Sequence, residues 1–338
     1  MTKLGHEVHI YTLRFRKDLP GEEKSGRVFI HRYAYVKDYV KPGSRNLMGV
    51  ARYAIETAAK LSSASFDVVL FNQWPLFHVA LAEPVCQCIT LIDWCEIWLE
   101  GVVSAIQRGI ARLPDAHMTV CPSTRSWLTE TCKIDVNKVE EIPSGVDTKL
   151  YASEMEEKEG GRILYVGRLV PHKHVDMLID AVRITREICP AVTLDIVGEG
   201  PSYQRLKEKV EGCENFITLH GYLREREKID LLKRAWVLAL LSEREGFPRV
   251  VAEAMASGTP IITADFPGNG AKDIVRRYNS GVAATPSPRM VSRCFAEMLK
   301  NRDEWKSFAD NAIQGAQSLD WHVIVRRLEG FLLSLLTK

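Results

Sequence analysis

The chain has 338 residues, of which 46% are hydrophobic and 26% are charged, a composition typical of soluble globular proteins with room for two domains. Its 45 lysines and arginines nearly balance its 43 aspartates and glutamates, so bulk charge gives no reason to expect nucleic acid as a partner. No apolar run approaches the roughly 20 residues of a membrane-spanning helix, and no hydrophobic signal segment opens the chain. The cysteines lack the paired spacing of zinc or redox sites, which favours reduced thiols in a cytoplasmic protein.

The first half of the chain predicts strands that alternate with helices. Its strand-like segments are β-branched and largely apolar, as buried parallel strands are. They cover residues 8–13, 28–35, 67–72, 87–93, 117–123 and 138–143, and helical stretches include 46–61 and 123–132. This alternation predicts a doubly wound α/β domain.

The second half repeats the alternation after a polar link that ends in Gly160 and Gly161. Strands are predicted at 162–167, 192–198, 216–221, 236–242 and 260–265, with helices such as 174–188 and 203–210 between them. We therefore expect an α/β protein with two doubly wound Rossmann-like domains, residues 1–153 and 154–316, followed by a C-terminal helix within 317–338.

Charged residues and glycines gather where the strands of the second half end. In open parallel sheets, ligands bind outside these carboxyl ends. Arg168 and Lys173 follow the first strand of this array, and Glu245 follows the fourth. The three glycines Gly167, Gly198 and Gly221 end the first three strands and allow close backbone approach. Taken alone the two cations would be surface charges, but together these residues suit a ligand with phosphates and sugar hydroxyls.

The segment 243–260 carries two glutamates whose spacing needs an explanation. Glu245 and Glu253 stand eight positions apart and would share no clean face of one helix. Pro248 suits the first position of a helix and Gly258 its stop, so a helix is predicted over 248–257. Glu245 then precedes this helix and Glu253 lies in its second turn.

The start of this predicted helix is a candidate anion site. The N–H groups of Arg249 and Val250 would be unpaired there, beside Glu245. The two carboxylates could then hold two parts of one elongated ligand. An acidic loop followed by a surface helix remains the alternative. His172 and His174 have no third ligand nearby, so a loop is favoured over a metal site, and no metal is expected.

These motifs resemble those of a retaining glycosyltransferase of family 4, which has the GT-B fold. The paired-glutamate motif is Glu245-Gly-Phe-Pro-Arg-Val-Val-Ala-Glu253, supported by "VGRLVPHK" before it and "IPSGVD" ahead of the link. The resemblance is strong over residues 162–286 and weaker in the first half. It implies two Rossmann-like domains facing across a cleft. A nucleotide-diphosphate sugar would be held chiefly by the C-terminal domain and an acceptor by the N-terminal one.

The resemblance also implies roles for individual residues. Arg168 and Lys173 would bind the diphosphate and stabilise it as it leaves. Glu253 would accept hydrogen bonds from the ribose, and Glu245 would face the transferred sugar without being assigned as a covalent nucleophile. Backbone around 247–250 would lie against sugar and phosphate, and the turn at 221–223 would meet the base. The expected donor-binding set is Gly167, Gly198, Gly221, Tyr222, Gly246, Phe247, Pro248, Arg249, Val250 and Glu253.

The reaction implied is transfer of a hexose-type sugar with retention of configuration, without a metal or cofactor, because fixed cations can stabilise the leaving phosphate. The acceptor would be a glycan, a lipid or a small molecule, and a peripheral contact with the inner membrane face is open. The terminal helix would pack back on the N-terminal domain. Two alternatives remain: a non-catalytic nucleotide-sugar binder, and a different enzyme such as a sugar-nucleotide epimerase. A phosphorylase would need a pyridoxal-binding lysine context, which is not found.

The chain departs from the family pattern in several places. "KLGHEV" stands at residue 3, so the family's first strand, its glycine-rich loop and most of the first helix are expected to be missing, which puts turnover in doubt. Asn72 stands where many relatives carry a histidine, and Asp273 where they usually carry a glutamate. Aromatic residues that could line an acceptor site, Trp74, Trp94 and Trp98, are favoured instead as packing residues.

Overall fold

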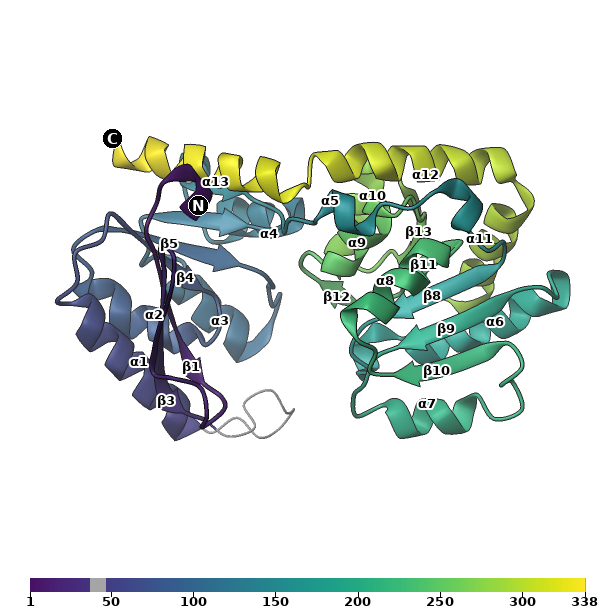
Figure 1. Ribbon diagram of the computed structural model, residues 1–338, viewed down its shortest axis with the longest axis horizontal. Coiled ribbons are helices and arrows are strands. Elements are labelled where there is room, and N and C mark those ends of the chain that lie inside the picture. Colours follow the sequence, from purple (N-terminus) through teal and green to yellow (C-terminus); the bar gives the residue numbers. More distant parts are fainter. Residues whose placement is uncertain (37–46, 338) are drawn as a thin grey trace. The chain divides into compact units, whose positions relative to one another are not determined.

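The computed structural model describes residues 1–36 and 47–337 and divides into two compact units (Figure 1). The first unit contains Met1–Thr119, Thr124–Glu141 and Val325–Lys338, and the second contains Val120–Ser123 and Ile142–Ile324. The chain therefore enters the second unit at Ile142, ahead of the 153/154 boundary expected from the sequence. The reason is that the short helix α5 (Thr148–Tyr151) packs against helices α8 and α9 of the second unit.

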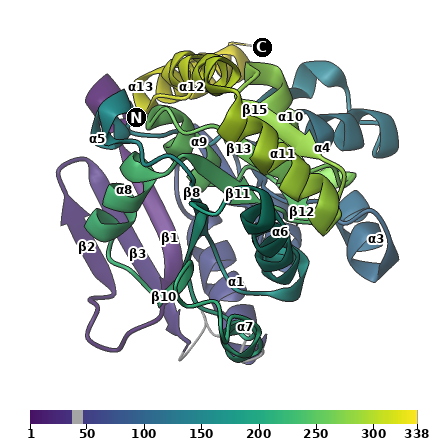
Figure 2. The same cartoon turned by 90° about the vertical axis from the view of Figure 1, so that its right-hand side faces the viewer.

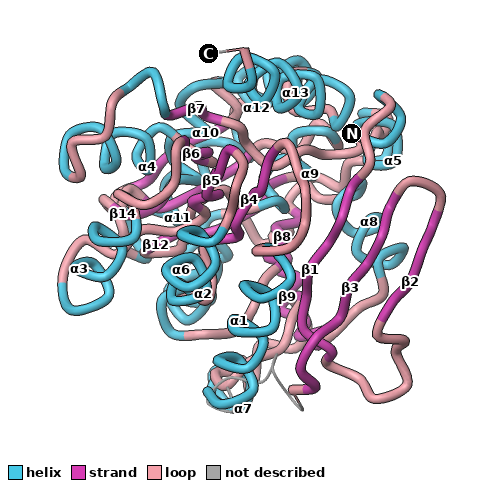
Figure 3. The backbone as a smooth tube through the Cα atoms, turned by 90° about the vertical axis from the view of Figure 1, so that its left-hand side faces the viewer, coloured by secondary structure: helices cyan, strands magenta, loops and turns pink. Residues whose placement is uncertain are grey.

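The first unit has two sheets. In one, β1 (Val8–Arg14) pairs in parallel with β3 (Val28–Tyr35), and β2 (Glu22–Ser25) pairs with β3 in antiparallel fashion (Figure 3). The other has the order β4-β5-β6-β7 and is all parallel. Its strands are β4 (Val68–Asn72), β5 (Ile89–Trp94), β6 (Ala116–Thr119) and β7 (Val139–Glu141).

Strands β1 and β4 are among the edge strands of the sheets described in the first unit. Parallel strands usually bury both faces. Here Ile10 in β1 is 43% exposed and Leu70 in β4 is 45% exposed. Strand β2 is also an edge strand and was not predicted, because all four of its residues, "EEKS", are polar and exposed.

Helices pack around the sheets of the first unit, and the first of them contacts β3 and β1. They include α1 (Leu47–Leu61), α2 (Leu76–Ala82) and α3 (Gly101–Ile110), with α2 in contact with both of the others. Asn46, the first residue of one predicted helix, lies outside the described residues. The predicted helix 123–132 is instead α4 (Pro122–Ser126) followed by a π-helical turn (Trp127–Thr131).

The packing role favoured for the tryptophans is confirmed most clearly for Trp94. Its side chain is fully buried, its ring lies 5.5 Å from that of Trp127, and its indole N–H donates to Nδ1 of His117 at 3.2 Å. Burial lowers the pKa of His117 to about 4, so the ring stays neutral and can accept this bond. Trp74 packs, partly buried, against the same core.

The second unit is built on one parallel sheet with the order β10-β9-β8-β11-β13-β15. Its strands are β8 (Arg162–Val166), β9 (Thr193–Val197), β10 (Ile217–Gly221), β11 (Val237–Leu240), β13 (Ile261–Ala264) and β15 (Gly281–Ala284). Chain order runs outward from β8 on one side and from β11 on the other. The junction of β8 and β11 is thus the topological switch point, where such sheets bind ligands.

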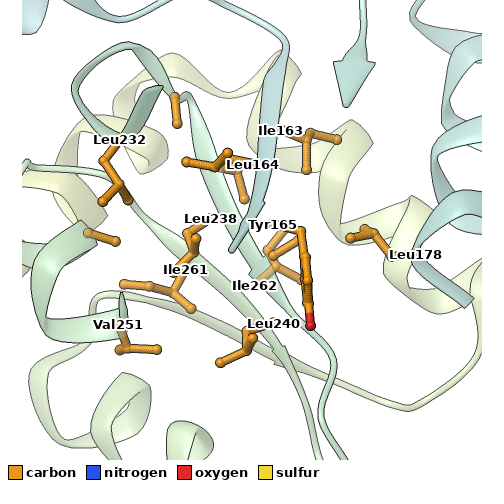
Figure 4. Packing of buried hydrophobic residues seen from close by; sticks show 14 of the residues in the cluster. Ile163, Leu164, Tyr165, Leu178, Leu232, Leu238, Leu240, Val251, Ile261 and Ile262 are labelled. Atoms are coloured by element: carbon orange, nitrogen blue, oxygen red, sulfur yellow. The ribbon is translucent and has the colours of Figure 1, made fainter. Parts of the chain in front are cut away.

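Helices flank this sheet, with α6 and α11 packed side by side (Figure 2). The helices are α6 (Val175–Ile188), α7 (Tyr203–Lys209), α8 (Glu225–Arg234), α9 (Arg249–Ala256), α10 (Gly270–Tyr278), α11 (Pro288–Lys300) and α12 (Arg302–Gln317). The central strands are closely packed: Leu164, Leu238 and Ile262 are each at most 1% exposed (Figure 4). A core this dense holds the strand ends in place.

The last helix, α13 (Trp321–Leu336), begins in the second unit and ends in the first. Within the first unit, Arg327 lies 2.8 Å from Oε1 of Glu140, and Nε2 of His6 lies 2.7 Å from Oε1 of Glu329. The segment 325–338 is therefore connected to the first unit by polar contacts near both β7 and the N-terminus.

Candidate functional site

The loops after β8 and β11 meet at the switch point and are tied together. The backbone N–H of Glu243 donates to the carbonyl of His172 at 2.8 Å. Nε2 of His174 lies 3.6 Å from the carboxylate of Glu243, and its ring stacks on Phe266 at 5.2 Å. Because both loops leave densely packed strands, these ties hold Lys173 and Glu245 opposite each other.

Lys173 and Glu245 form an ion pair at this point. Lys173 is only 9% exposed, and its Nζ donates to Oε1 of Glu245. The same carboxylate oxygen accepts from the hydroxyl of Ser242 at 2.9 Å. Charges removed from water need such partners, since an unpaired buried charge is strongly destabilising. The structure thus brings together the lysine and the glutamate that the sequence placed on different strand ends.

Two short strands fix the backbone at Glu245. Residues Arg244–Glu245 (β12) pair in parallel with Gly268–Asn269 (β14). The amide of Asn269 then donates to the hydroxyl of Thr263 at 2.9 Å and its oxygen caps the start of α10. The carboxylate of Glu245 is therefore held from its backbone as well as by its ion pair.

Arg168 lies beside this pair but differs from it in exposure. Its side chain is exposed and makes no ion pair with the described residues. Its backbone carbonyl accepts a hydrogen bond from the hydroxyl of Tyr165 at 2.9 Å. Burial, with the nearby charge of Glu245, raises the pKa of Tyr165, which keeps its hydroxyl protonated as the donor. Arg168 is thus a cation on an anchored backbone.

The glycines at the strand ends pack against one another. A Cβ on Gly198 would lie 1.9 Å from the carbonyl oxygen of Gly167, and Gly198 has a φ of +139°. The N–H of Gly198 donates to the carbonyl of Gly221 at 2.8 Å. At these glycines, the backbones of neighbouring loops lie in close contact with each other.

Helix α9 starts one residue later than predicted. Pro248 is buried and has an extended ψ of 110°, so it is the N-cap and Arg249 is the first helical residue. Gly258 follows the helix with a φ of +61°, as predicted for its stop. A Cβ on Gly270 would lie 2.0 Å from the carbonyl of Gly246, so α10 begins directly against the loop that leads into α9.

Glu253 does not meet Glu245 in a shared contact but has its own cation. Nζ of Lys228, on α8, lies 3.0 Å from Oε2 of Glu253. Phe247 and Val250 are partly buried against the core, whereas Tyr222 at the end of β10 is 73% exposed. The predicted donor residues therefore surround the carboxyl ends of β8, β9, β10 and β11.

Several residues of the site were not predicted, namely Ser242, Lys228 and Tyr151. Ser242 is the last residue of the predicted strand 236–242, but a lone serine carries no signal of a binding site. Lys228 lies in "EREKIDLLKR", a charged helix whose sequence does not show which side chain turns inward. Asp273, the expected substitute for a family glutamate, has a buried Oδ2 without a hydrogen-bond partner among the described atoms. Asn72 accepts from the N–H of Trp74 at 3.1 Å, a local turn contact.

Comparison with known proteins agrees with this geometry. Residues 148–315 match the family described as "Glycosyl transferases group 1", and residues 1–150 match "Glycosyltransferase Family 4". A glycogen synthase of Mycobacterium tuberculosis is 28% identical over 239 residues, which is 65% of this chain and 56% of that protein. The GtfA subunit of a peptide N-acetylglucosaminyltransferase of Streptococcus agalactiae is 33% identical over 55% of this chain and 38% of that protein. The chain thus spans only about half or less of the length of these curated relatives.

Solved structures show the same fold. Sucrose-phosphate synthase from Thermosynechococcus elongatus superposes with a TM-score of 0.82 at 18% identity, covering 99% of this chain and 90% of that one. HepE of Anabaena, solved in complex with UDP-glucose, superposes with a TM-score of 0.74 at 19% identity, covering 90% and 86%. Together, the two family models, the paired-glutamate motif and the parallel sheets show that the chain belongs to glycosyltransferase family 4 and has the GT-B fold.

Proposed function

We propose that this protein transfers a hexose-type sugar from a nucleotide-diphosphate sugar to an acceptor hydroxyl, with retention of configuration. The observation that carries the proposal is the arrangement at the switch point of the second unit. Arg168 is an exposed cation there, Lys173 is a shielded one, and Glu245 is held against Lys173. Helix α9 begins at Arg249, four residues after Glu245, so a helix N-terminus follows this carboxylate closely in the chain.

These groups suit the departure of a nucleoside diphosphate. As the bond between the sugar and the phosphate oxygen breaks, negative charge grows on the departing diphosphate. Arg168 and Lys173 would stabilise that charge, together with the N–H groups at the start of α9. Fixed cations of this kind would supply the stabilisation without a metal ion, and no cofactor is proposed. UDP-sugars are the donors to test first, because HepE was solved with UDP-glucose and a similar structure, the pneumococcal O-GlcNAc transferase GtfA, was solved with UDP and GlcNAc.

The two glutamates would have separate tasks. Glu245 would face the transferred sugar, where its ion pair with Lys173 holds it in one orientation. Attack by the acceptor from the face that the diphosphate leaves would retain the configuration, so no covalent role is given to Glu245. Glu253 would accept hydrogen bonds from the ribose at the other end of the donor. Glycans, lipids and small molecules remain candidate acceptors.

Incubation with UDP-, GDP- and ADP-sugars and a panel of glycan and lipid acceptors tests the proposal. Release of a free nucleoside diphosphate with a new glycoside of the donor's anomeric configuration, seen by NMR and in the presence of EDTA, supports it. Donor binding without turnover would favour a non-catalytic binder. Conversion of the sugar nucleotide without an acceptor would favour an epimerase.

We also propose a cytoplasmic location with peripheral contact to a membrane through helices α1, α2 and α3. None of the helices in the described part of the chain is long and apolar enough to cross a membrane. These three helices nevertheless expose large apolar side chains: Met48 (81%), Ile55 (62%), Leu81 (47%), Val102 (77%) and Ile106 (48%). In α3 the usual pattern is inverted, because Ser104 and Gln107 are buried while Val102 is exposed. Large apolar side chains exposed on three helices of one unit are the feature on which we base this proposed contact.

Sedimentation with vesicles tests this contact. Exposed Arg108 and Arg112 lie on or next to α3, so phosphatidylglycerol vesicles should bind the protein better than phosphatidylcholine vesicles. Replacing Val102 and Ile106 together by aspartate should abolish that binding. Val136→Asp, at a residue of the same unit that is 50% exposed but lies outside these helices, should not change it. Equal sedimentation of all three proteins would contradict the proposal.

A further inference from the structure

Glu253 belongs to a polar cluster that is separate from the ion pair of Lys173 and Glu245. The cluster consists of Tyr151 on α5, Glu225 and Lys228 on α8, and Glu253 on α9, three helices that contact one another. Nζ of Lys228 lies 3.0 Å from Oε2 of Glu253, 2.9 Å from Oε1 of Glu225 and 3.1 Å from the hydroxyl oxygen of Tyr151. Lys228 is therefore the group that all three other members share.

The hydrogen-bond count shows what Lys228 can do. A lysine ammonium has three N–H donors and no acceptor. Two of these donors go to Oε2 of Glu253 and to the hydroxyl oxygen of Tyr151, the ammonium also forms an ion pair with Glu225, and the side chain of Lys228 is only 15% exposed. A phosphate would therefore have to displace these partners to reach Lys228, whereas Arg168 is exposed and has no ion pair among the described residues. The interaction left to Lys228 is with the members of its own cluster.

Tyr151 and Glu225 hold Lys228 in place. The hydroxyl of Tyr151 donates to Oε1 of Glu225 at 2.6 Å, and this bond lowers the pKa of the Glu225 carboxyl. Burial, followed by the same bond, raises the pKa of Tyr151, so the proton stays on the tyrosine. The ammonium also lies 5.5 Å above the Tyr151 ring, a distance typical of a cation–π contact. Lys228 is thus held by Tyr151 and Glu225 while its ammonium group also contacts Glu253.

Glu253 retains hydrogen-bonding capacity while it is held. A carboxylate has about four lone-pair sites on its two oxygens, and Lys228 occupies one of them. The remaining sites suit two neighbouring hydroxyl groups, such as the 2′- and 3′-hydroxyls of a ribose. Without the ammonium, Glu253, whose side chain is 14% exposed, would lie near the carboxylate of Glu225 with no cation to fix its rotamer.

We propose that Lys228 is a positioning residue for ribose recognition: it orients Glu253 so that its carboxylate accepts from the ribose hydroxyls of the donor. This inference rests on the proposed function, because it takes the ligand at Glu253 to be a nucleotide. It adds a residue that touches no part of the donor and sets the preference for ribose over deoxyribose.

Calorimetric binding of UDP, GDP and ADP, each compared with its 2′-deoxy analogue, tests the inference. The wild-type protein should bind at least one ribonucleotide about 10- to 100-fold more tightly than its analogue, the range expected for a hydrogen bond to a charged acceptor. In Lys228→Met, this ratio should fall to about threefold or less. Affinity for the 2′-deoxy analogue should fall less than affinity for the ribonucleotide, because the analogue has only its 3′-hydroxyl to offer to Glu253.

Two further variants serve as references. Glu253→Gln should lower the ratio in the same way, and combining it with Lys228→Met should lower it no further, since both act on one contact. Lys233→Met makes the same substitution on the same helix and should keep the wild-type ratio. If circular dichroism shows that Lys228→Met does not fold, Lys228→Gln takes its place.

The outcomes separate the inference from the function. If the wild-type protein binds none of the nucleotides, the proposed function fails and the inference falls with it. If the wild-type protein prefers ribonucleotides and a folded Lys228 variant keeps that preference, the function stands and the inference is wrong. Equal weakening of both members of a nucleotide pair would also overturn it, because it would show only a packing role for Lys228.

Discussion

At the scale of single residues, the charged groups of the second unit differ in how they are paired, and this decides what each can do. Arg168 is exposed and without an ion pair among the described residues, so it is available to a ligand. Lys173 and Lys228 are shielded and matched to Glu245 and Glu253. A ligand that reaches Lys173 must therefore share it with Glu245, whereas Lys228 acts through the carboxylate it holds.

The first prediction concerns these residues as donor ligands. Glu253→Gln keeps the size of the side chain but loses the charged acceptor, so donor affinity should weaken by about 1.5–3 kcal/mol. Arg168→Ala and Lys173→Ala should reduce both donor binding and turnover, because they remove charge from the diphosphate site. Calorimetry with the preferred nucleotide measures these effects, and unchanged affinity in all three variants would show that the site lies elsewhere.

Lys158 supplies a second prediction, on pH. Its Nζ donates to the hydroxyl of Thr259 at 2.6 Å and to the carbonyl of Leu232 at 3.3 Å, without an ion pair. Burial lowers the pKa of this lysine from 10.5 to about 7. Between these two values the unfolded chain binds a proton that the folded chain does not. The free energy of unfolding should therefore rise with pH in this window, by at most about 1.4 kcal/mol per pH unit from this group.

Denaturant unfolding at pH 7, 8 and 9 checks this prediction. Lys158→Met removes the titrating group, so its unfolding free energy should rise less with pH than that of the wild-type protein. Below pH 7 the curves of the two proteins should run parallel, because Lys158 is then protonated in both states. Parallel curves across the whole range would mean that Lys158 titrates as an ordinary lysine.

At the scale of elements, the site depends on how closely neighbouring strand ends and loops pack. The carboxyl ends of β8, β9 and β10 are linked through Gly167, Gly198 and Gly221, whose backbones approach too closely for side chains at Gly198. The loop before α9 is likewise pressed against Gly270. The shape of the site is therefore built from backbone contacts that only glycine allows.

The third prediction tests this packing with Gly198→Ala. The added Cβ would meet the carbonyl oxygen of Gly167 at 1.9 Å, on a residue with a φ of +139°. We expect the free energy of unfolding to fall by about 2–4 kcal/mol, from backbone strain and steric conflict together. Gly160→Ala is the matched control, since nothing lies within 4 Å of its added Cβ, and it should change stability by less than about 0.5 kcal/mol. Similar melting curves for both variants would contradict the packing argument.

At the scale of the whole molecule, the chain enters the second unit briefly at Val120–Ser123 and again at Ile142, and it returns to the first unit within α13. Val325–Lys338 belongs to the first unit, where Arg327 pairs with Glu140 and Glu329 with His6. Helix α13 is thus divided between the units: its residues up to Ile324 belong to the second unit and those from Val325 to the first.

The fourth prediction follows from this division. Removing residues 325–338 should destabilise the first unit, seen as faster hydrogen exchange in β7 and at the N-terminus, while exchange in β8–β13 stays unchanged. Arg327→Ala should have a much smaller effect, below about 1 kcal/mol, because that ion pair is partly exposed to solvent. Equally fast exchange in both units after truncation would show that their stabilities are not separate.

Local sequence determined the positions of most strands and helices. Every strand predicted in the second half is present, because runs such as "ILYV" and "LALL" are buried on both faces of a parallel sheet, and burial selects for β-branched and apolar residues. The motif around Glu245 and Glu253 also placed one glutamate before α9 and the other within it. Where the local pattern is weak, prediction missed the strand, as with the charged edge strand β2 and the short "GVAA" of β15.

Only the tertiary structure decided which charges meet. Lys173 and Glu245 are 72 positions apart, and Lys228 and Glu253 are 25 apart, so neither pairing leaves a trace in local periodicity. The pairing of Lys173 with Glu245 depends on the strand order, which places β8 beside β11. The pairing of Lys228 with Glu253 depends on the packing of α5, α8 and α9 against one another. The sequence by itself therefore determined the elements, the motif and the residue types at the strand ends. The pairing of those residues was decided by long-range packing, because ion pairs form between whichever charges the folded backbone brings together.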